Sequence, residues 1–260
     1  MEMDIKAVFF DFDDTLVSKK TNKMIESTRK ALELLHLKNI IPIMATGRPM
    51  YTIKKYIDEL KIENGVFLNG HVTWANGEII LDKRLGHEKI NHIFDMAEEH
   101  DLAYAVVTNE DTYLSCDASE LADMFVINND YKVKKLERAD NIDGNLLWVF
   151  AKEALDNKVV ESAREKDMRS LRWGEEGVDI ISNDVSKRTG VEVLLKKLGL
   201  DFSEIMFFGD GDNDIELMEA SKIGVAMGNG TEELKKVSDY VTDHIEEDGI
   251  YNALVKFEII

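Results

Sequence analysis

The sequence predicts an α/β protein with a parallel-sheet core and a second, smaller α+β domain. Short apolar runs alternate with amphipathic helical stretches in both terminal parts of the chain, which is typical of βα units. The middle, roughly 83 to 183, has a different pattern of strand-like runs and two helices. A length of 260 residues leaves room for two domains.

The first part of the chain begins with the apolar run "AVFF", which predicts a buried strand that ends directly in aspartates. Ile25, Leu32 and Leu35 recur with helical spacing in the stretch that follows. In chain order we expect the strand 7–10, the helix 25–37, the strand 40–46, the helix 50–62 and the strand 65–70.

The last part of the chain repeats this alternation. Ser186 and Thr231 are expected to be helix N-caps, because their side-chain oxygens can accept hydrogen bonds from the free amides of a first helical turn. In chain order we expect the helix 186–200, the strand 204–210, the helix 214–221, the strand 223–230, the helix 231–238 and the strand 240–242.

The middle of the chain is expected to be an inserted domain. Its strands are predicted at 103–109, 111–116 and 145–152, and its helices near 87–100 and 154–167. We therefore expect residues 1–82 and 184–260 to form the core domain and residues 83–183 to form the insert.

The composition excludes several classes of partner. With 51 acidic against 32 basic residues and a net charge of −19, the chain would repel a nucleic acid. A small phosphorylated substrate remains compatible, since a bound cation reverses the field locally. Cys116 is the only cysteine, so neither an intrachain disulfide nor a thiolate zinc cluster can form. The first apolar run is too short for a signal or membrane segment, and we expect a cytoplasmic protein without a membrane partner.

Polar residues lie at the carboxyl ends of four of the predicted core strands. They are Asp11 with Asp13, Thr46, Asp210 and the turn "GNGT" at 228–231. Ligands bind at the carboxyl ends of strands in open α/β sheets, so these residues are expected to converge on one crevice. Carboxylates gathered there disfavour joint ionisation unless a cation is present, and carboxylate oxygens suit Mg²⁺.

Each motif has an alternative interpretation. Aspartates such as those at 11–14 also cap turns and helices. The stretch "GDGDND" at 209–214 imitates the first half of an EF-hand loop, but Ile215 and Ser221 stand where that loop needs glycine and glutamate. The EF-hand is excluded, and a solvated acidic turn remains open. "GNGT" either cradles an anion or forms an ordinary tight turn.

Taken together, "DFDDTL", "MATGR", "VSKRTGV" and "GDGDND" resemble, in this order, the four motifs of the haloacid dehalogenase superfamily. With "FLNG" and "GVAMGNGTEELK", the chain resembles its Cof-type phosphatases, which carry a large α/β cap between the second and third motifs. The resemblance covers nearly all of the chain outside the insert. It implies a Rossmann-like catalytic core, a cap that sets substrate specificity, and the activity of a phosphoric monoester hydrolase.

The resemblance implies four catalytic residues. Asp11 would be the nucleophile, and Asp13 would protonate the leaving group and then deprotonate water. Residues i and i+2 at a strand end point to the same side, so both carboxylates can face one phosphoryl group. Thr46 and Lys187 would donate hydrogen bonds to the phosphate oxygens.

The resemblance also implies the ligands of the metal and of the phosphate. The Mg²⁺ ligands would be Asp11, Asp13 through its backbone carbonyl, Asp210, and Asp214 through the metal's waters or Lys187. Gly47 and Asn213 would contact the phosphate.

Two residues depart from the family's pattern. Asp14 stands where glycine is most common, and His71 stands where a small residue usually follows "NG". Asp14 adds charge beside the phosphate site, and we expect its side chain to point away from the phosphate and to cap the segment that follows. A single histidine is more often structural or solvated, so His71 is not assigned to the site.

The expected function is hydrolysis of a small phosphomonoester, such as a sugar phosphate, by a monomer or weak homodimer. One rival is a phosphotransferase such as a phosphomutase, which uses the same aspartyl-phosphate. Others are a phospho-accepting switch module and a non-catalytic binding module. Asp13 and the insert disfavour the switch, because a long-lived phospho-aspartate needs neither a built-in acid and base nor a cap.

Overall fold

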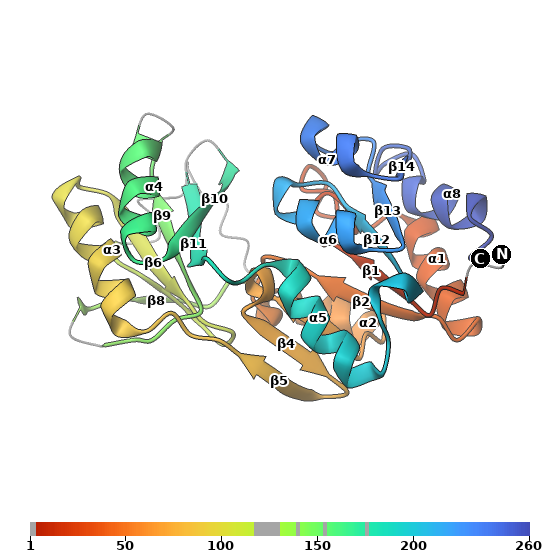
Figure 1. Ribbon diagram of the computed structural model, residues 1–260, viewed down its shortest axis with the longest axis horizontal. Coiled ribbons are helices and arrows are strands. Elements are labelled where there is room, and N and C mark those ends of the chain that lie inside the picture. Colours follow the sequence, from red (N-terminus) through yellow and green to blue (C-terminus); the bar gives the residue numbers. More distant parts are fainter. Residues whose placement is uncertain (1–3, 117–130, 139–140, 153–154, 175–176) are drawn as a thin grey trace. The chain divides into compact units, whose positions relative to one another are not determined.

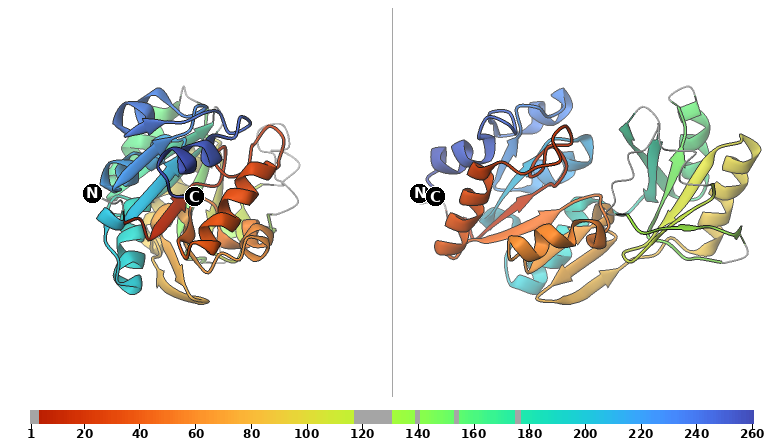
Figure 2. Two further views of the ribbon diagram at one scale, coloured as in Figure 1. Left: turned by 90° about the vertical axis from the view of Figure 1, so that its right-hand side faces the viewer. Right: turned by 180° about the vertical axis from the view of Figure 1, so that it is seen from behind.

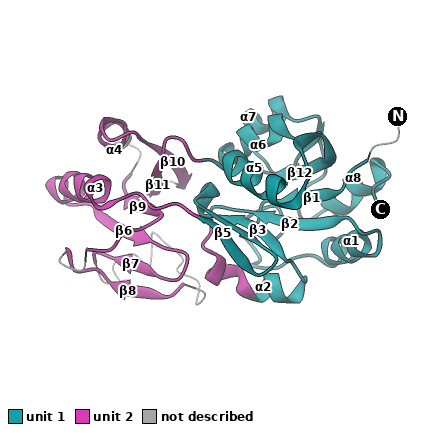
Figure 3. Ribbon diagram, turned by 60° about the horizontal axis from the view of Figure 1, so that its bottom comes forward, with its two compact units in different colours: residues 1–47, 55–81, 186–260 teal, residues 48–54, 82–185 magenta. Residues whose placement is uncertain are grey.

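A computed structural model describes residues 4–116, 131–138, 141–152, 155–174 and 177–260 (Figure 1). The chain divides into two compact units (Figure 3). The first comprises residues 1–47, 55–81 and 186–260, and the second comprises residues 48–54 and 82–185. Of the helices in the described ranges, none has both the length and the apolar character needed to cross a membrane.

The first unit is built on a sheet of eight strands in the order β14-β13-β12-β1-β2-β3-β4-β5. These strands are β1 (Ala7–Phe10), β2 (Ile41–Ala45), β3 (Asn64–Phe67), β4 (Val72–Ala75), β5 (Glu78–Asp82), β12 (Ile205–Gly209), β13 (Ile223–Ala226) and β14 (Tyr240–Val241). Pairing is parallel from β14 to β3 and antiparallel between β3 and β4. The central strand β1 lies between β2 and β12, with Phe10 opposite Met44 and Phe208.

Helices cover this sheet because each buries one apolar face (Figure 2). Helices α5 (Lys187–Leu198), α6 (Ile215–Ala220) and α7 (Glu232–Val237) pack apolar side chains against strand residues such as Phe9, Ile43 and Phe207. Helix α1 (Glu26–Leu37) packs against β2 and α8 (Gly249–Lys256). All four strand residues of β1 are buried, which places Asp11 at the end of a strand within the core.

The second unit has a separate sheet and core. The sheet order is β10-β11-β9-β6-β7-β8. Its elements are α3 (His87–Glu99), β6 (Ala103–Val107), β7 (Thr112–Leu114), β8 (Val133–Lys135), β9 (Leu146–Phe150), α4 (Asp156–Glu165), β10 (Met168–Gly174) and β11 (Gly177–Ser182). Apolar residues of α3 and α4 pack on one face of the sheet, against Val106, Val149 and Ile180.

The predicted fold class is confirmed: a parallel-sheet core of Rossmann type accompanies a smaller α+β unit. The segment expected to be a single helix over 50–62 is instead a 3-10 turn, Met50–Ile53, followed by α2 (Lys54–Glu59). The two N-caps are also confirmed, with Ser186 Oγ accepting from Thr189 N and Thr231 Oγ1 accepting from Leu234 N.

Candidate active site

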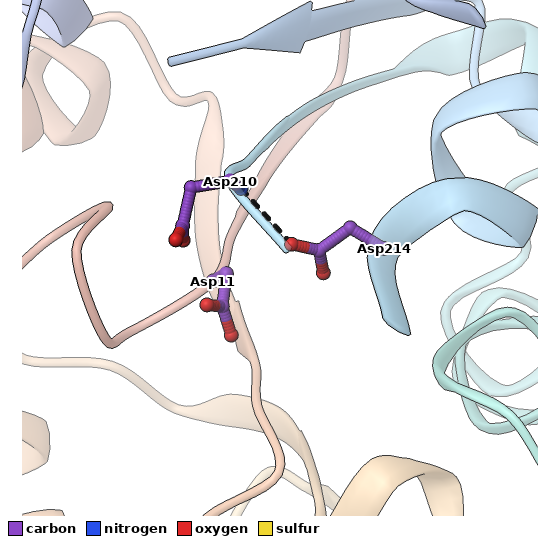
Figure 4. Close-up of side chains that lie close together, drawn as sticks. All are labelled: Asp11, Asp210 and Asp214. Carbon is purple, nitrogen blue, oxygen red and sulfur yellow. Dashed lines mark hydrogen bonds between the residues drawn. The ribbon is translucent and has the colours of Figure 1, made fainter. Parts of the chain in front are cut away.

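Three carboxylates come together at the carboxyl ends of two neighbouring strands of the first unit. Asp11 follows β1 and Asp210 follows β12, and Asp214 lies in the 3-10 turn Asp212–Asp214. One carboxylate oxygen from each lies within 4.8 Å of the other two (Figure 4). The parallel pairing of β1 with β12 brings Asp11 close to Asp210. The pairing continues one residue past β1, because Asp11 N donates to Phe208 O at 2.9 Å. Such a group of oxygens can hold a metal ion.

The "GDGDND" stretch folds around the side chain of Asp214. Asp214 Oδ2 accepts hydrogen bonds from Asp210 N at 3.0 Å and Gly211 N at 3.1 Å. A Cβ on Gly209 would lie 2.5 Å from Asp214 Oδ2, so glycine is required for this close approach. The turn therefore fixes Asp214 in a fully buried position, and a solvated acidic turn is ruled out for this residue.

Lys187 places a buried ammonium group among these carboxylates. It is the first residue of α5, directly after the Ser186 cap, and it is 1% exposed. Its Nζ donates to Asp11 Oδ1 and to Asp214 Oδ1, each at 2.6 Å. Helix α5 packs closely against the turn at Gly70, where a Cβ on Gly190 would lie only 2.9 Å from Gly70 Cα. This close approach allows Lys187, at the start of the helix, to reach the carboxylates.

Burial and mutual repulsion disturb the acidity of this cluster. Desolvation, only partly offset by the ammonium of Lys187, raises the pKa of Asp11 to about 6. Desolvation and the charges of Asp11 and Asp214 raise the pKa of Asp210 to about 8. Burial by itself lowers the pKa of Lys187, but Asp11 and Asp214 reverse this and raise it above the ordinary value. The single positive charge of Lys187 therefore does not neutralise the negative charge of the three carboxylates.

A charge-removing substitution should therefore stabilise the metal-free protein. In Asp210→Asn, with chelator at about pH 9, we expect Tm to rise by about 2–4 °C, because a partly buried charge that neighbouring carboxylates repel is removed. Asp210 has a raised pKa in the folded state, so its cost to stability is complete above about pH 8 and decreases progressively as the pH falls toward the unperturbed pKa of 3.8. The gain should accordingly shrink as the pH falls below about 8 and vanish only near pH 4. Thermal unfolding of the variant and the wild type at each pH measures the difference in Tm.

The exposed Asp212 on the same loop provides the control for this experiment. Asp212→Asn retains the oxygen that accepts from Thr231 Oγ1, and we expect no change in Tm. A Tm for Asp210→Asn below that of the wild type at about pH 9 would contradict the electrostatic interpretation.

A second group of polar residues lies beside the ends of β2 and β3. Thr46, which is 1% exposed, accepts from Asn69 N through its backbone carbonyl at 3.1 Å. Asn213 Nδ2 donates to Asn69 Oδ1 at 2.9 Å. A Cβ on Gly47 would lie 3.1 Å from the same Asn69 oxygen. The structure therefore gathers Thr46, Gly47 and Asn213 around Asn69.

The interpretation of the sequence missed Asn69 as a residue of this site. The signal was the motif "FLNG", in which Leu68, Asn69 and Gly70 all have positive φ angles. Asparagine tolerates the left-handed region, and the resulting turn directs its amide to Asn213. A nearby residue was also missed: Thr15 Oγ1 donates to Asp210 Oδ1 at 2.8 Å.

Asp13 is partly exposed, and its charge is close enough to Asp11 to contribute to raising the pKa of that residue. The Asp13 carboxylate is not among the three that cluster. This position is compatible with the expected backbone contact to a metal, because that contact does not use the side chain.

The two departures from the family's pattern have structural explanations. Asp14 has a φ of 56°, in the left-handed region that aspartate tolerates, and its Oδ1 accepts from Lys19 N at 2.8 Å. The expectation that it caps the following segment is confirmed. His71 is fully buried, and its Nδ1 is 2.8 Å from Leu68 O, which makes it structural. In the turn "GNGT", the side chain of Asn229 donates to Asp14 O and accepts from Ile245 N, so this turn is bound to two other segments of the chain.

This fold and site define a class of α/β enzymes that place the active site at the carboxyl edge of a parallel sheet. A family model described as haloacid dehalogenase-like hydrolase matches residues 8–254. The chain belongs to this family of hydrolases. The sequence-based recognition is thereby confirmed.

Individual relatives agree with this assignment over nearly the whole chain. The Bacillus subtilis protein YkrA is 28% identical, with 99% of this chain and 100% of that protein covered. The 5-amino-6-(5-phospho-D-ribitylamino)uracil phosphatase YcsE of Bacillus subtilis is 25% identical, with 97% and 96% covered. Among solved structures, the subclass IIB sugar phosphatase BT4131 is 29% identical with a TM-score of 0.88, covering 98% of this chain and 100% of that one.

Proposed function

We propose that this protein is a Mg²⁺-dependent phosphatase that hydrolyses small phosphomonoesters, such as sugar phosphates, through an aspartyl-phosphate intermediate. One observation supports it above all: Lys187 bonds Asp11 and Asp214 at a site that Asp210 also reaches. The site thus contains a nucleophile, a fixed cation and metal-binding oxygens. The phosphatase activity named for YcsE and BT4131 agrees in chemical class.

The residues present fit a Mg²⁺ ion. The donors are carboxylate oxygens, which a hard cation prefers. Burial, together with the charges of neighbouring carboxylates, raises the pKa of Asp11 and of Asp210, and a cation would relieve this cost. In this proposal the ion is held by Asp11, the backbone carbonyl of Asp13, Asp210, and Asp214 through water or Lys187. When bound, Mg²⁺ supplies positive charge that neutralises the phosphoryl oxygens.

The chain's own residues carry out two displacements at phosphorus in this proposal. An oxygen of Asp11 forms a bond to phosphorus while the bond to the leaving oxygen breaks, and Asp13 gives that oxygen its proton. Asp13 then takes a proton from water as the water attacks phosphorus and releases Asp11. Asp13 suits this role because its partly exposed side chain reaches solvent while its charge acts on Asp11.

The remaining polar residues bind and orient the phosphoryl group. Lys187 is fixed by two hydrogen bonds before substrate arrives, so little reorganisation is needed when charge shifts during the reaction. Thr46, Gly47 and Asn213, arranged around Asn69, supply further donors in this proposal. The division into two units is compatible with a catalytic core, 1–82 and 184–260, and a cap, 83–183, that sets specificity. We expect the protein to act on small molecules in the cytoplasm.

A phosphate-release screen tests the proposal. Sugar phosphates, nucleotides and cofactor phosphates are each incubated with Mg²⁺ and with chelator, and inorganic phosphate and the alcohol are both measured. We expect equal amounts of the two products with Mg²⁺ and none with chelator. Turnover that survives chelation would contradict the metal requirement. Isomerised product with little free phosphate would indicate a phosphomutase, and no reaction with any substrate would favour a binding module.

A further inference from the structure

The loop that follows Asp13 carries an ion pair that the mechanism above does not use. Asp14 Oδ1 accepts from Lys19 N at 2.8 Å, and Asp14 Oδ2 lies 3.5 Å from Lys19 Nζ. The left-handed backbone of Asp14 turns its side chain toward Lys19. The loop also doubles back on itself, with Asp14 N donating to Val17 O at 2.8 Å. These contacts hold Lys19 against Asp14, the residue directly after Asp13.

This loop is attached to the carboxylate cluster on one side and to the C-terminal part of the unit on the other. Thr15, which is fully buried, donates to Asp210 Oδ1 at 2.8 Å. Asn229 Nδ2 donates to Asp14 O at 2.8 Å, and Asn229 Oδ1 accepts from Ile245 N at 2.9 Å. The residue that holds Lys19 is therefore fixed at its backbone as well as through its side chain.

Lys19 experiences the charges of the active site. Partial burial lowers its pKa, but the carboxylates of Asp13, Asp14 and Asp210 more than reverse this and raise the pKa above the ordinary value. The adjacent Lys20 is different, because its Nζ turns to Glu246 at 3.7 Å. Lys187, in contrast, is completely buried between two carboxylates. Lys19, with its side chain 56% exposed, remains accessible to an incoming anion.

We propose that Lys19, positioned by Asp14, is a second phosphate-binding lysine that contacts the phosphoryl group of the bound substrate. The inference rests on the proposed phosphatase function and adds a residue to its site. The ion pair with Asp14 holds the ammonium on the loop directly after Asp13 when substrate is absent. An arriving phosphate dianion offers Lys19 a more highly charged partner, and the lysine compensates repulsion between that dianion and Asp13.

A role in stability alone does not account for this arrangement. Exposed ion pairs contribute about 0–1 kcal/mol, so Asp14 and Lys19 add little to folding through their charges. Asp14 also adds a negative charge directly after Asp13, which is unfavourable for an anionic substrate that binds nearby. Lys19, held by the Asp14 carboxylate, neutralises this charge and places a positive group where it can bind an anion.

The test compares Lys19→Met with Lys20→Met as the matched control. With p-nitrophenyl phosphate and Mg²⁺, we expect Lys19→Met to raise KM by about tenfold, with kcat changed less than about twofold. The inhibition constant of inorganic phosphate should rise by a similar factor. Lys20→Met should leave KM, kcat and the inhibition constant unchanged. Lys19→Arg should restore most of the affinity, and the Tm of each variant should match the wild type.

Asp14 is tested as a positioning residue by combining substitutions. Asp14→Asn keeps the oxygen that accepts from Lys19 N and removes the charge that holds Nζ. In that background Lys19→Met should raise KM by a smaller factor, since the ammonium is no longer held. An equal or larger factor would overturn the role of Asp14. An unchanged KM in Lys19→Met, with normal wild-type turnover, would overturn the inference alone, whereas absent wild-type turnover would overturn the proposed function.

Discussion

Asp11→Asn is expected to lower phosphatase turnover by about ten thousandfold or more, while the protein remains folded. An amide is a poor nucleophile and carries no charge, so it neither forms the bond to phosphorus nor contributes a metal-binding carboxylate. Folding should survive because Asp11 has a raised pKa, which shows that its charge is unfavourable in this buried position. Lys187 retains its other hydrogen bond, to Asp214.

The measurement combines phosphate release with thermal unfolding. Asp101→Asn is a matched control, because Asp101 is exposed and its left-handed φ of 54° suits asparagine as well as aspartate. We expect full turnover in that variant. Turnover in Asp11→Asn within about tenfold of the wild type would show that Asp11 is not the nucleophile.

Much of the core and its site was predictable because the signals are local. A run of four apolar residues followed by Asp11 identifies both the buried strand β1 and the residue at its carboxyl end. The caps Ser186 and Thr231 depend on hydrogen bonds to residues three positions away. Once the strands are known to be parallel, the meeting of Asp11 with Asp210 follows from the topology.

The missed features depend on contacts between distant parts of the chain. Asn69 gains its importance from Asn213, 144 residues away, and neither side chain shows this in its own segment. The hairpin of β4 and β5 was not predicted, and β5 is mostly exposed, with little of the alternation that identifies a half-buried strand. The segment Arg48–Lys54 belongs to the second unit although it follows Gly47 directly. Residues 117–130, between two predicted strands of the insert, lie outside the described residues.

Asp14 illustrates how sequence and structure contribute different parts of an explanation. The sequence identified it as the residue that departs from the family's pattern, and it indicated a capping role. The structure supplies the partner, Lys19, five residues further on. It also supplies Asn229, which is 215 residues away and holds the Asp14 carbonyl. The second partner could not be inferred from a turn motif alone.

Lys187→Met should cause the largest loss of stability among these variants and should also reduce turnover by at least a hundredfold. Methionine fills a similar volume but leaves Asp11 and Asp214 buried without their ammonium partner. Removing one partner of a buried ion pair costs about 3–5 kcal/mol. Turnover falls because a donor fixed toward the phosphoryl oxygens is lost.

Lys196→Met provides the control on the same helix. Lys196 is 73% exposed and pairs with Glu192 across one turn of α5, an interaction that contributes about 0.3–0.5 kcal/mol. We expect denaturant unfolding in chelator to show a change of about that size for Lys196→Met and one several times larger for Lys187→Met. Similar losses in the two variants would contradict the charge network described here.

The stability loss in Lys187→Met should depend on pH with a defined sign. The pKa of Asp11 is about 6 in the folded protein, above its value of 3.8 when unperturbed, and loss of the ammonium raises it further. The folded state therefore binds this proton more tightly than the unfolded state, so its stability rises as the pH falls toward about 4. The deficit relative to wild type should shrink between about pH 8 and pH 5, and added Mg²⁺ should reduce it at pH 8 by supplying the missing positive charge. A deficit that is constant with pH and unaffected by Mg²⁺ would mean that Lys187 stabilises the protein through packing and not through its charge.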